Sequence, residues 1–139
     1  MKRRIVFAVL ALLWLGFIFF NSMQDAETSG GMSEGLLSWL GLPGSMETLL
    51  RKSAHFCAFF MLGMLISGAL TKMNIPMPLI LLIVLVCACA DETIQLFSVG
   101  RSSELRDVWI DLSGGTLGTL SAALFFFLRK RKKKITIEK

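Results

Sequence analysis

Four long apolar stretches limit what this chain can fold into. They cover residues 5–20, 53–70, 77–97 and 108–128, and each approaches the roughly 20 residues that an α-helix needs to cross a bilayer. Hydrophobic residues make up 54% of the chain and charged residues only 18%, so a soluble domain of 139 residues would lack polar surface. We therefore expect an all-α integral membrane bundle of four transmembrane helices that forms a single domain over residues 1–139.

The first apolar stretch also invites comparison with a signal sequence, because it follows a basic start. It ends, however, in GFIFFNSMQ, with bulky residues where a cleavage site would have small ones. We interpret it as an uncleaved transmembrane helix.

Basic residues mark the two ends of the chain. Lys2, Arg3 and Arg4 precede the first stretch, and the run RKRKKK at residues 129–134 follows the last one. Because basic residues beside a span favour the cytoplasmic side, we expect a multi-pass protein of the plasma membrane with both termini in the cytoplasm and a basic tail from about residue 129. The loop at residues 71–76 would then be a tight cytoplasmic hairpin. We expect no nucleic-acid partner, since each basic run abuts an apolar span and is explained by the lipid bilayer.

The segment between the first two spans differs from both ends in its charge. Residues 21–50 carry only acidic charges, which agrees with a position outside the cell. Within this segment, MSEGLLSWLGLPG at residues 32–44 holds four leucines and Trp39 between glycines. This pattern predicts a short helix in the outer membrane interface, with Trp39 at the level of the lipid headgroups.

Charged and amide side chains gather at one end of the predicted bundle, the outer end in this topology. These residues are Arg51, Lys52, His55, Asp91, Glu92, Gln95, Arg101, Asp107 and Asp111. At 1.5 Å per residue from Met77, Asp91 lies roughly 21 Å along a span through a hydrocarbon layer about 30 Å thick. Carboxylates at that depth must be paired, hydrated or protonated. We expect Asp91 and Glu92 to meet basic residues of the neighbouring segments, and the available cations are Arg51, Lys52, Arg101 and Arg106.

Small residues in the last span predict a close helix–helix contact. In DLSGGTLGTLSAA, Gly114 and Gly118 are four residues apart, a spacing that lets two membrane helices approach closely. We favour packing within one bundle over a contact between protomers, and the sequence leaves the oligomeric state open.

Four motifs, in this order, resemble the VanZ-like family. They are NS at residues 21–22, RKSAHF at 51–56, DETIQLFSVGR at 91–101, and the aspartates and glycine of DVWIDLSG at 107–114. The resemblance extends over essentially the whole chain, and the chain departs from the family pattern at Asp111, where the family commonly carries Asn. The resemblance implies a small multi-span membrane protein of the cell envelope that is linked to resistance to glycopeptide antibiotics, teicoplanin in particular. It implicates Arg51, Lys52, His55, Asp91, Glu92, Gln95, Arg101 and Asp107.

Two functions fit these residues best. In the first, the outer polar site binds an envelope lipid such as a phospholipid, a lipid-linked cell-wall precursor or the glycopeptide. The binding residues would be Arg51, Lys52, Gln95, Arg101 and Asp111. In the second, the protein is a membrane-embedded enzyme that acts on a lipid-linked or phospholipid substrate. The candidate acids and bases would be His55, Glu92, Asp91 and Asp107.

Other functions have weaker support. A transporter is disfavoured because the inner two thirds of the spans offer no polar relay. A purely structural ion-pair network is a further alternative. We expect no cofactor, because the three cysteines have no metal-ligand spacing and one histidine with scattered carboxylates is a weak metal site. A hard cation bound by acidic side chains stays open, and the candidates are Asp91, Glu92, Asp107 and Asp111.

Overall fold

The structure is a computed structural model that describes residues 2–70, 75–101 and 104–137, with side chains through residue 131. Its elements are the helices α1 (Lys2–Ser22), α2 (Ala26–Leu40), α3 (Glu47–Leu70), α4 (Met77–Leu96) and α5 (Leu105–Ile137), with the short 3-10 helix η1 (Gly44–Met46) before α3. This part of the chain contains no β-strand, so the all-α prediction is confirmed. Of the hairpin predicted at residues 71–76, residues 71–74 lie outside the described ranges.

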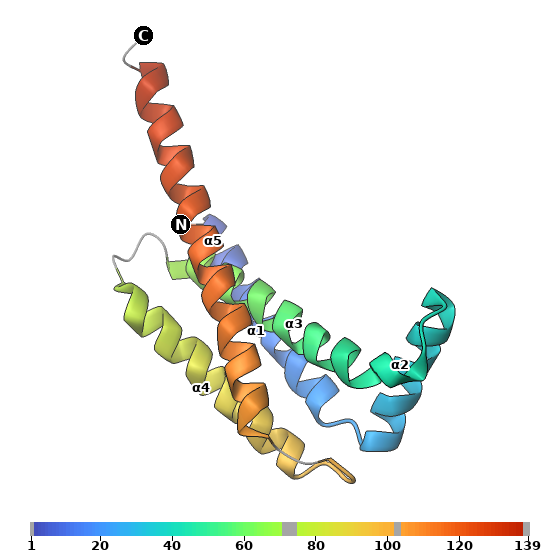
Figure 1. Ribbon diagram of the computed structural model, residues 1–139. Helices are drawn as coiled ribbons and strands as arrows, with labels where there is room; N and C mark the ends of the chain where they lie inside the picture. The colour runs from blue at the N-terminus through green and yellow to red at the C-terminus, as the bar shows by residue number, and fades with distance from the viewer. Residues whose placement is uncertain (1, 71–74, 102–103, 138–139) are drawn as a thin grey trace.

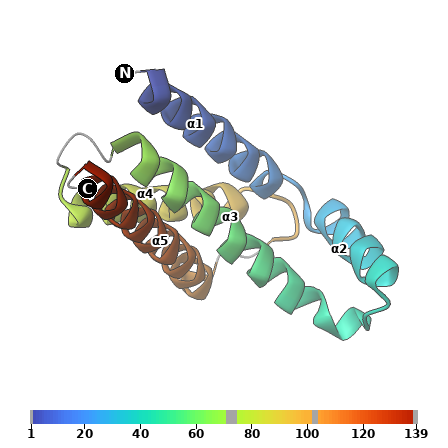
Figure 2. The ribbon, with the colours of Figure 1, turned by 90° about the horizontal axis from the view of Figure 1, so that it is seen from above.

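Four of the five α-helices are long and apolar enough to cross a membrane, namely α1, α3, α4 and α5. Successive membrane helices run in opposite directions, so that the first and last helical residues lie toward the same end of the bundle and α5 projects beyond its neighbours (Figure 1). In Figure 2, α3 lies between α1 and α5, and α2 lies beside the end of α1 and the beginning of α3. Helices α1 and α4 end, and helices α3 and α5 begin, at the same end of the bundle. We call this end the polar end.

Local capping interactions explain where the short helix α2 begins and ends. Asp25 precedes α2 with an extended backbone, and its side chain accepts a hydrogen bond from the Thr28 amide at 2.7 Å. Hydrogen bonding to the side chain of Thr28, and to its backbone amide, lowers the pKa of the exposed Asp25 carboxyl from its ordinary value. Gly41 ends the helix in the left-handed conformation, with φ of 68°. The helix therefore starts earlier than the predicted segment at residues 32–44 and leaves Trp39 80% exposed.

Helices α3 and α5 extend well beyond their apolar stretches. The η1 turn leads directly into α3 at Glu47, which places Arg51 and Lys52 inside the helix and not before it. Helix α5 begins at Leu105 and continues past the apolar stretch at residues 108–128 through the basic run to Ile137. Arg and Lys are good helix formers, so the change in hydrophobicity at residue 129 does not interrupt the backbone.

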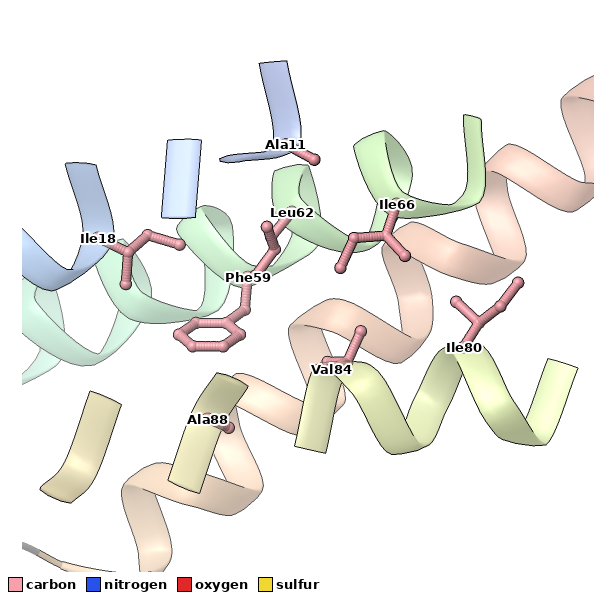
Figure 3. Packing of buried hydrophobic residues seen from close by; sticks show 8 residues of the cluster. All are labelled: Ala11, Ile18, Phe59, Leu62, Ile66, Ile80, Val84 and Ala88. Atoms are coloured by element: carbon pink, nitrogen blue, oxygen red, sulfur yellow. The ribbon is translucent and has the colours of Figure 1, made fainter. Parts of the chain in front are cut away.

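The apolar core lies between α1, α3 and α4 (Figure 3). Its central side chains, Phe59 of α3 with Val84 and Ala88 of α4, are 0% exposed. The core residues that the figure draws are Ala11, Ile18, Phe59, Leu62, Ile66, Ile80, Val84 and Ala88. The Trp14 indole adds a hydrogen bond at 2.9 Å from α1 to the Ala58 carbonyl of α3. Large apolar side chains also cover the outside, for example Leu12 at 69% and Leu124 at 58% exposure, as a lipid-facing surface requires.

Helices α3 and α5 of the same chain pack so closely that their backbones are in contact. Gly114 and Gly118 of α5 lie against the carbonyl groups of Phe56 and Phe60, which are one turn apart on α3. A Cβ atom at either glycine would overlap the facing carbonyl oxygen. The two glycines therefore provide the close contact that their spacing predicted.

A methyl group at this contact should destabilise the bundle. We expect Gly118→Ala to lower the free energy of unfolding by about 1–3 kcal/mol, because the added Cβ meets backbone that cannot move aside without shifting a helix. The matched control is Gly16→Ala on α1, where no atom lies within 4 Å of the added Cβ. Unfolding of both variants in detergent micelles measures the difference, and equal stability would show that the α3–α5 contact is looser than described.

Candidate functional site

A cavity of about 300 Å³ opens at the polar end between α1, α2 and α3. Apolar side chains form much of its wall, including Phe17 of α1 and Leu36 of α2. Among the residues described along its lining, the titratable ones are Arg51, His55 and Arg101, and all three are basic. We call this cavity the basic pocket. The full lining is Phe17, Ile18, Asn21, Ser22, Gln24, Ser29, Met32, Ser33, Leu36, Leu50, Arg51, Ala54, His55, Ala58 and Arg101.

Arg101 is held in the wall of the basic pocket by hydrogen bonds to α1 and α2. Its guanidinium donates to the carbonyl of Ser22 at 3.3 Å and to the hydroxyl of Ser29 at 3.2 Å. The loop that carries Arg101 is fixed as well, since the Ala26 amide donates to the Val99 carbonyl at 3.0 Å. Burial and the neighbouring Arg51 lower the pKa of Arg101 from its ordinary value, although an arginine stays protonated.

Three helices bring His55, Asp91 and Asp111 together behind the pocket wall. His55 Nδ1 lies 3.6 Å from Asp91 Oδ2 and 3.5 Å from Asp111 Oδ1. Both carboxylate side chains are 0% exposed, whereas His55 is 18% exposed because it also lines the basic pocket. One ligand atom from each residue lies within 4.8 Å of the other two, which is compact enough for a metal ion. We call these three residues the His–Asp–Asp cluster.

Neutral donors orient Asp91 within this cluster. The Ser22 hydroxyl donates to Asp91 Oδ1 at 2.6 Å, and the Gln95 amide donates to Oδ2 at 3.0 Å. Both hydrogen bonds are buried, so they fix the carboxylate and disperse its charge. The sequence predicted an arginine or lysine partner for Asp91, but among its described contacts these two donors and His55 take that place.

Two predicted site residues belong to a separate ion pair. Lys52 Nζ lies 2.8 Å from Asp107 Oδ1 and 3.4 Å from Glu104 Oε2, which joins α3 to the beginning of α5. Neither Lys52 nor Asp107 lines the basic pocket as the structure describes it. Their spacing along the helices placed them near the site, but they point to the α5 side of α3.

Glu92 has a structural role at the start of α5. Its side chain is buried, and Oε2 accepts a hydrogen bond from the Glu104 backbone amide at 3.0 Å. A carboxylate at this position accepts a hydrogen bond from an amide that has no partner within the helix. Its negative charge is also stabilised by the positive end of the helix dipole.

The predicted site residues therefore divide into four groups. Arg51 and Arg101 line the basic pocket; His55, Asp91, Gln95 and Asp111 form or support the His–Asp–Asp cluster; Lys52 pairs with Asp107; and Glu92 caps α5. Sequence reasoning missed Ser22 as a partner of Asp91, whereas the interfacial segment predicted at residues 32–44 does contribute Met32, Ser33 and Leu36 to the pocket lining. The NS pair at the end of the first span was the available signal for Ser22.

One family comparison is informative for this chain. A family model described as VanZ/LLP1 matches residues 7–127, which extend from α1 into α5 and include the basic pocket and the His–Asp–Asp cluster. No curated protein and no solved structure matches the chain significantly.

Removing the hydroxyl that supports Asp91 should weaken the fold. We expect Ser22→Ala to lower the free energy of unfolding by about 1–3 kcal/mol, because a buried carboxylate loses a donor that water cannot replace. The control is Ser113→Ala, since the Ser113 hydroxyl donates only to the Trp109 carbonyl of its own helix at an exposed position. Denaturation of both variants in micelles provides the comparison, and an unchanged Ser22→Ala would show that Asp91 is not ionised in the folded protein.

Proposed function

The chain belongs to the VanZ/LLP1 family, and from this membership we propose that it is a membrane protein of the cell envelope whose basic pocket binds a phosphate-bearing lipid headgroup. A membrane phospholipid and a lipid-linked cell-wall precursor share this chemistry. Binding of either would alter what a glycopeptide such as teicoplanin meets at the cell surface, which connects the pocket to the resistance that the family resemblance implies.

The charge of the pocket lining carries this proposal. Arg51 and Arg101 are close enough to affect one another electrostatically, and an anion bound between two guanidinium groups in a half-buried cavity is stabilised by both. The carboxylates that act on Arg101 do not line the cavity; they are Asp91, Glu92 and Asp107. Guanidinium groups bind phosphate through paired hydrogen bonds. Phe17, Met32 and Leu36 supply an apolar wall beside these cations, which suits the acyl or prenyl chain attached to the headgroup.

The orientation in the membrane is part of the same proposal. The basic residues at both chain ends favour a cytoplasmic position for both termini, which puts the polar end and the basic pocket at the outer surface of the plasma membrane. In a chain with its three cysteines replaced by alanine, an impermeant thiol reagent applied to intact cells should label Ser45→Cys and should label Lys130→Cys only after lysis. Labelling of Lys130→Cys in intact cells would contradict this orientation.

A second candidate function is an enzyme at the same site, and one observation favours it. His55 both lines the basic pocket and contacts the buried carboxylates of Asp91 and Asp111. An imidazole positioned in this way can act as a general acid or base toward a substrate in the pocket. Loss of phospholipid or precursor turnover in His55→Gln, with lipid binding retained, would favour the enzyme, and binding without turnover by the wild type would favour the binder.

Neutralising a pocket arginine should weaken lipid binding. We expect Arg51→Gln and Arg101→Gln each to reduce affinity for short-chain phosphatidylglycerol at least tenfold, about 1.4 kcal/mol, because each removes a charged donor to the phosphate. Arg106→Gln is the control, since it has the same charge change at an exposed position outside the pocket lining. Calorimetric titration of the purified protein in detergent measures all three.

Arg51→Gln is the more decisive of the two pocket variants. Arg101 also donates hydrogen bonds to α1 and α2, so its loss affects local structure, whereas none of the hydrogen bonds described in the structure involves Arg51. If Arg51→Gln binds the lipid as tightly as Arg106→Gln does, the proposed headgroup site is wrong. Teicoplanin susceptibility of cells that express each variant at equal membrane levels then tests the link to resistance.

A further inference from the structure

We propose that His55, Asp91 and Asp111 bind one divalent transition-metal ion, and that zinc is the ion these ligands suit best. The proposal concerns the His–Asp–Asp cluster and not the arginines, so it goes beyond lipid binding and does not depend on it. Imidazole and carboxylate together suit zinc, whereas magnesium and calcium prefer oxygen ligands alone.

The distances within the cluster fit ligands of a shared ion. A charged hydrogen bond between an imidazole nitrogen and a carboxylate oxygen is about 2.7–2.9 Å long. Two ligands of one tetrahedral zinc ion, with bonds of about 2.0–2.2 Å, lie about 3.3–3.6 Å apart. His55 Nδ1 is 3.6 Å from Asp91 Oδ2 and 3.5 Å from Asp111 Oδ1, so both distances match the second arrangement. All three ligand atoms lie within 4.8 Å of one another.

The surroundings of Asp111 also favour a bound cation, independently of the distances. Its side chain is 0% exposed, and neither of its carboxylate oxygens has a hydrogen-bond partner among the described residues. Burying an ionised carboxylate without hydrogen bonds to its oxygens is costly, and the cost is not reduced in a membrane. Asp111 lies 3.5 Å from the imidazole nitrogen that it shares with Asp91. A cation between these groups would bind the Asp111 carboxylate directly, in addition to its 3.5 Å contact with His55.

The charges of the cluster also favour a divalent ion. A neutral imidazole with a doubly charged cation balances the two carboxylates completely. An imidazolium balances the charge of only one carboxylate. The charge of the second carboxylate would then have to be balanced by Arg101, which already donates hydrogen bonds to Ser22 and Ser29. The divalent ion is therefore the better match for a site in which both carboxylates are 0% exposed.

Supporting contacts and an access route complete the site. Ser22 and Gln95 donate to the two oxygens of Asp91, and hydrogen bonds of this kind commonly orient the side chains that bind a metal ion. His55 forms part of the pocket lining, so an ion and its fourth ligand can reach the cluster from the basic pocket.

Zinc uptake by the protein tests the proposal. Wild-type protein without a histidine tag is purified in detergent, stripped with a chelator and dialysed against zinc, and the bound metal is measured by elemental analysis. We expect one zinc per chain for wild type and for the control Glu34→Gln, an exposed carboxylate on α2 with the same charge change. We expect at least tenfold weaker zinc binding for Asp111→Asn, because the neutral amide is a poor ligand.

Two results would overturn the proposal: no stoichiometric zinc in wild type, or equal zinc affinity in wild type and Asp111→Asn. Because Asp111→Asn could fail to fold, cobalt in the wild-type protein supplies a readout that needs no variant. Tetrahedral cobalt absorbs visible light far more strongly than hydrated cobalt, so we expect an intense visible band that added zinc abolishes. Absence of that band would also overturn the proposal, and neither outcome depends on lipid.

Discussion

The backbone contact between α3 and α5 is the interaction on which the rest of the site depends. Gly114 and Gly118 let α5 lie directly against the carbonyl groups of α3, and any side chain there would push the helices apart. The contact lies one helical turn from the cluster, since Gly114 faces Phe56 while Asp111 faces His55. A wider spacing would move Asp111 out of reach of the imidazole. The glycines therefore set both the stability of the bundle and the geometry of its buried charges.

The polar end separates negative from positive groups on the two sides of His55. The carboxylates of Asp91 and Asp111 are completely buried behind it, and Arg51 and Arg101 line the cavity in front of it. Such an arrangement suits a cation on the buried side and an anion on the open side. The proposed metal ion and the proposed lipid phosphate thus occupy different places, and His55 is the residue between them.

Much of the fold could be predicted from the sequence, because length and hydrophobicity alone define a membrane helix. The same reasoning placed His55, Asp91, Gln95 and Asp111 near one end of the bundle. It could not assign partners, since helical spacing fixes which residues share a face but not how neighbouring helices are rotated. That is why Asp91 was expected to meet an arginine or lysine and instead meets Ser22, Gln95 and His55. The pocket itself was not predicted, because the sequence does not show how α2 packs against α1 and α3.

The central claim is that a lipid phosphate binds between Arg51 and Arg101, and its position can be measured directly. Solid-state NMR in phosphatidylglycerol bilayers can detect dipolar coupling between the lipid phosphorus and isotope-labelled guanidinium nitrogens. We predict strong coupling to Arg51 and Arg101, which line the basic pocket, and weak coupling to the exposed Arg106. Equal coupling to all three arginines would indicate only general attraction to an anionic surface, and no coupling to Arg51 would contradict the claim.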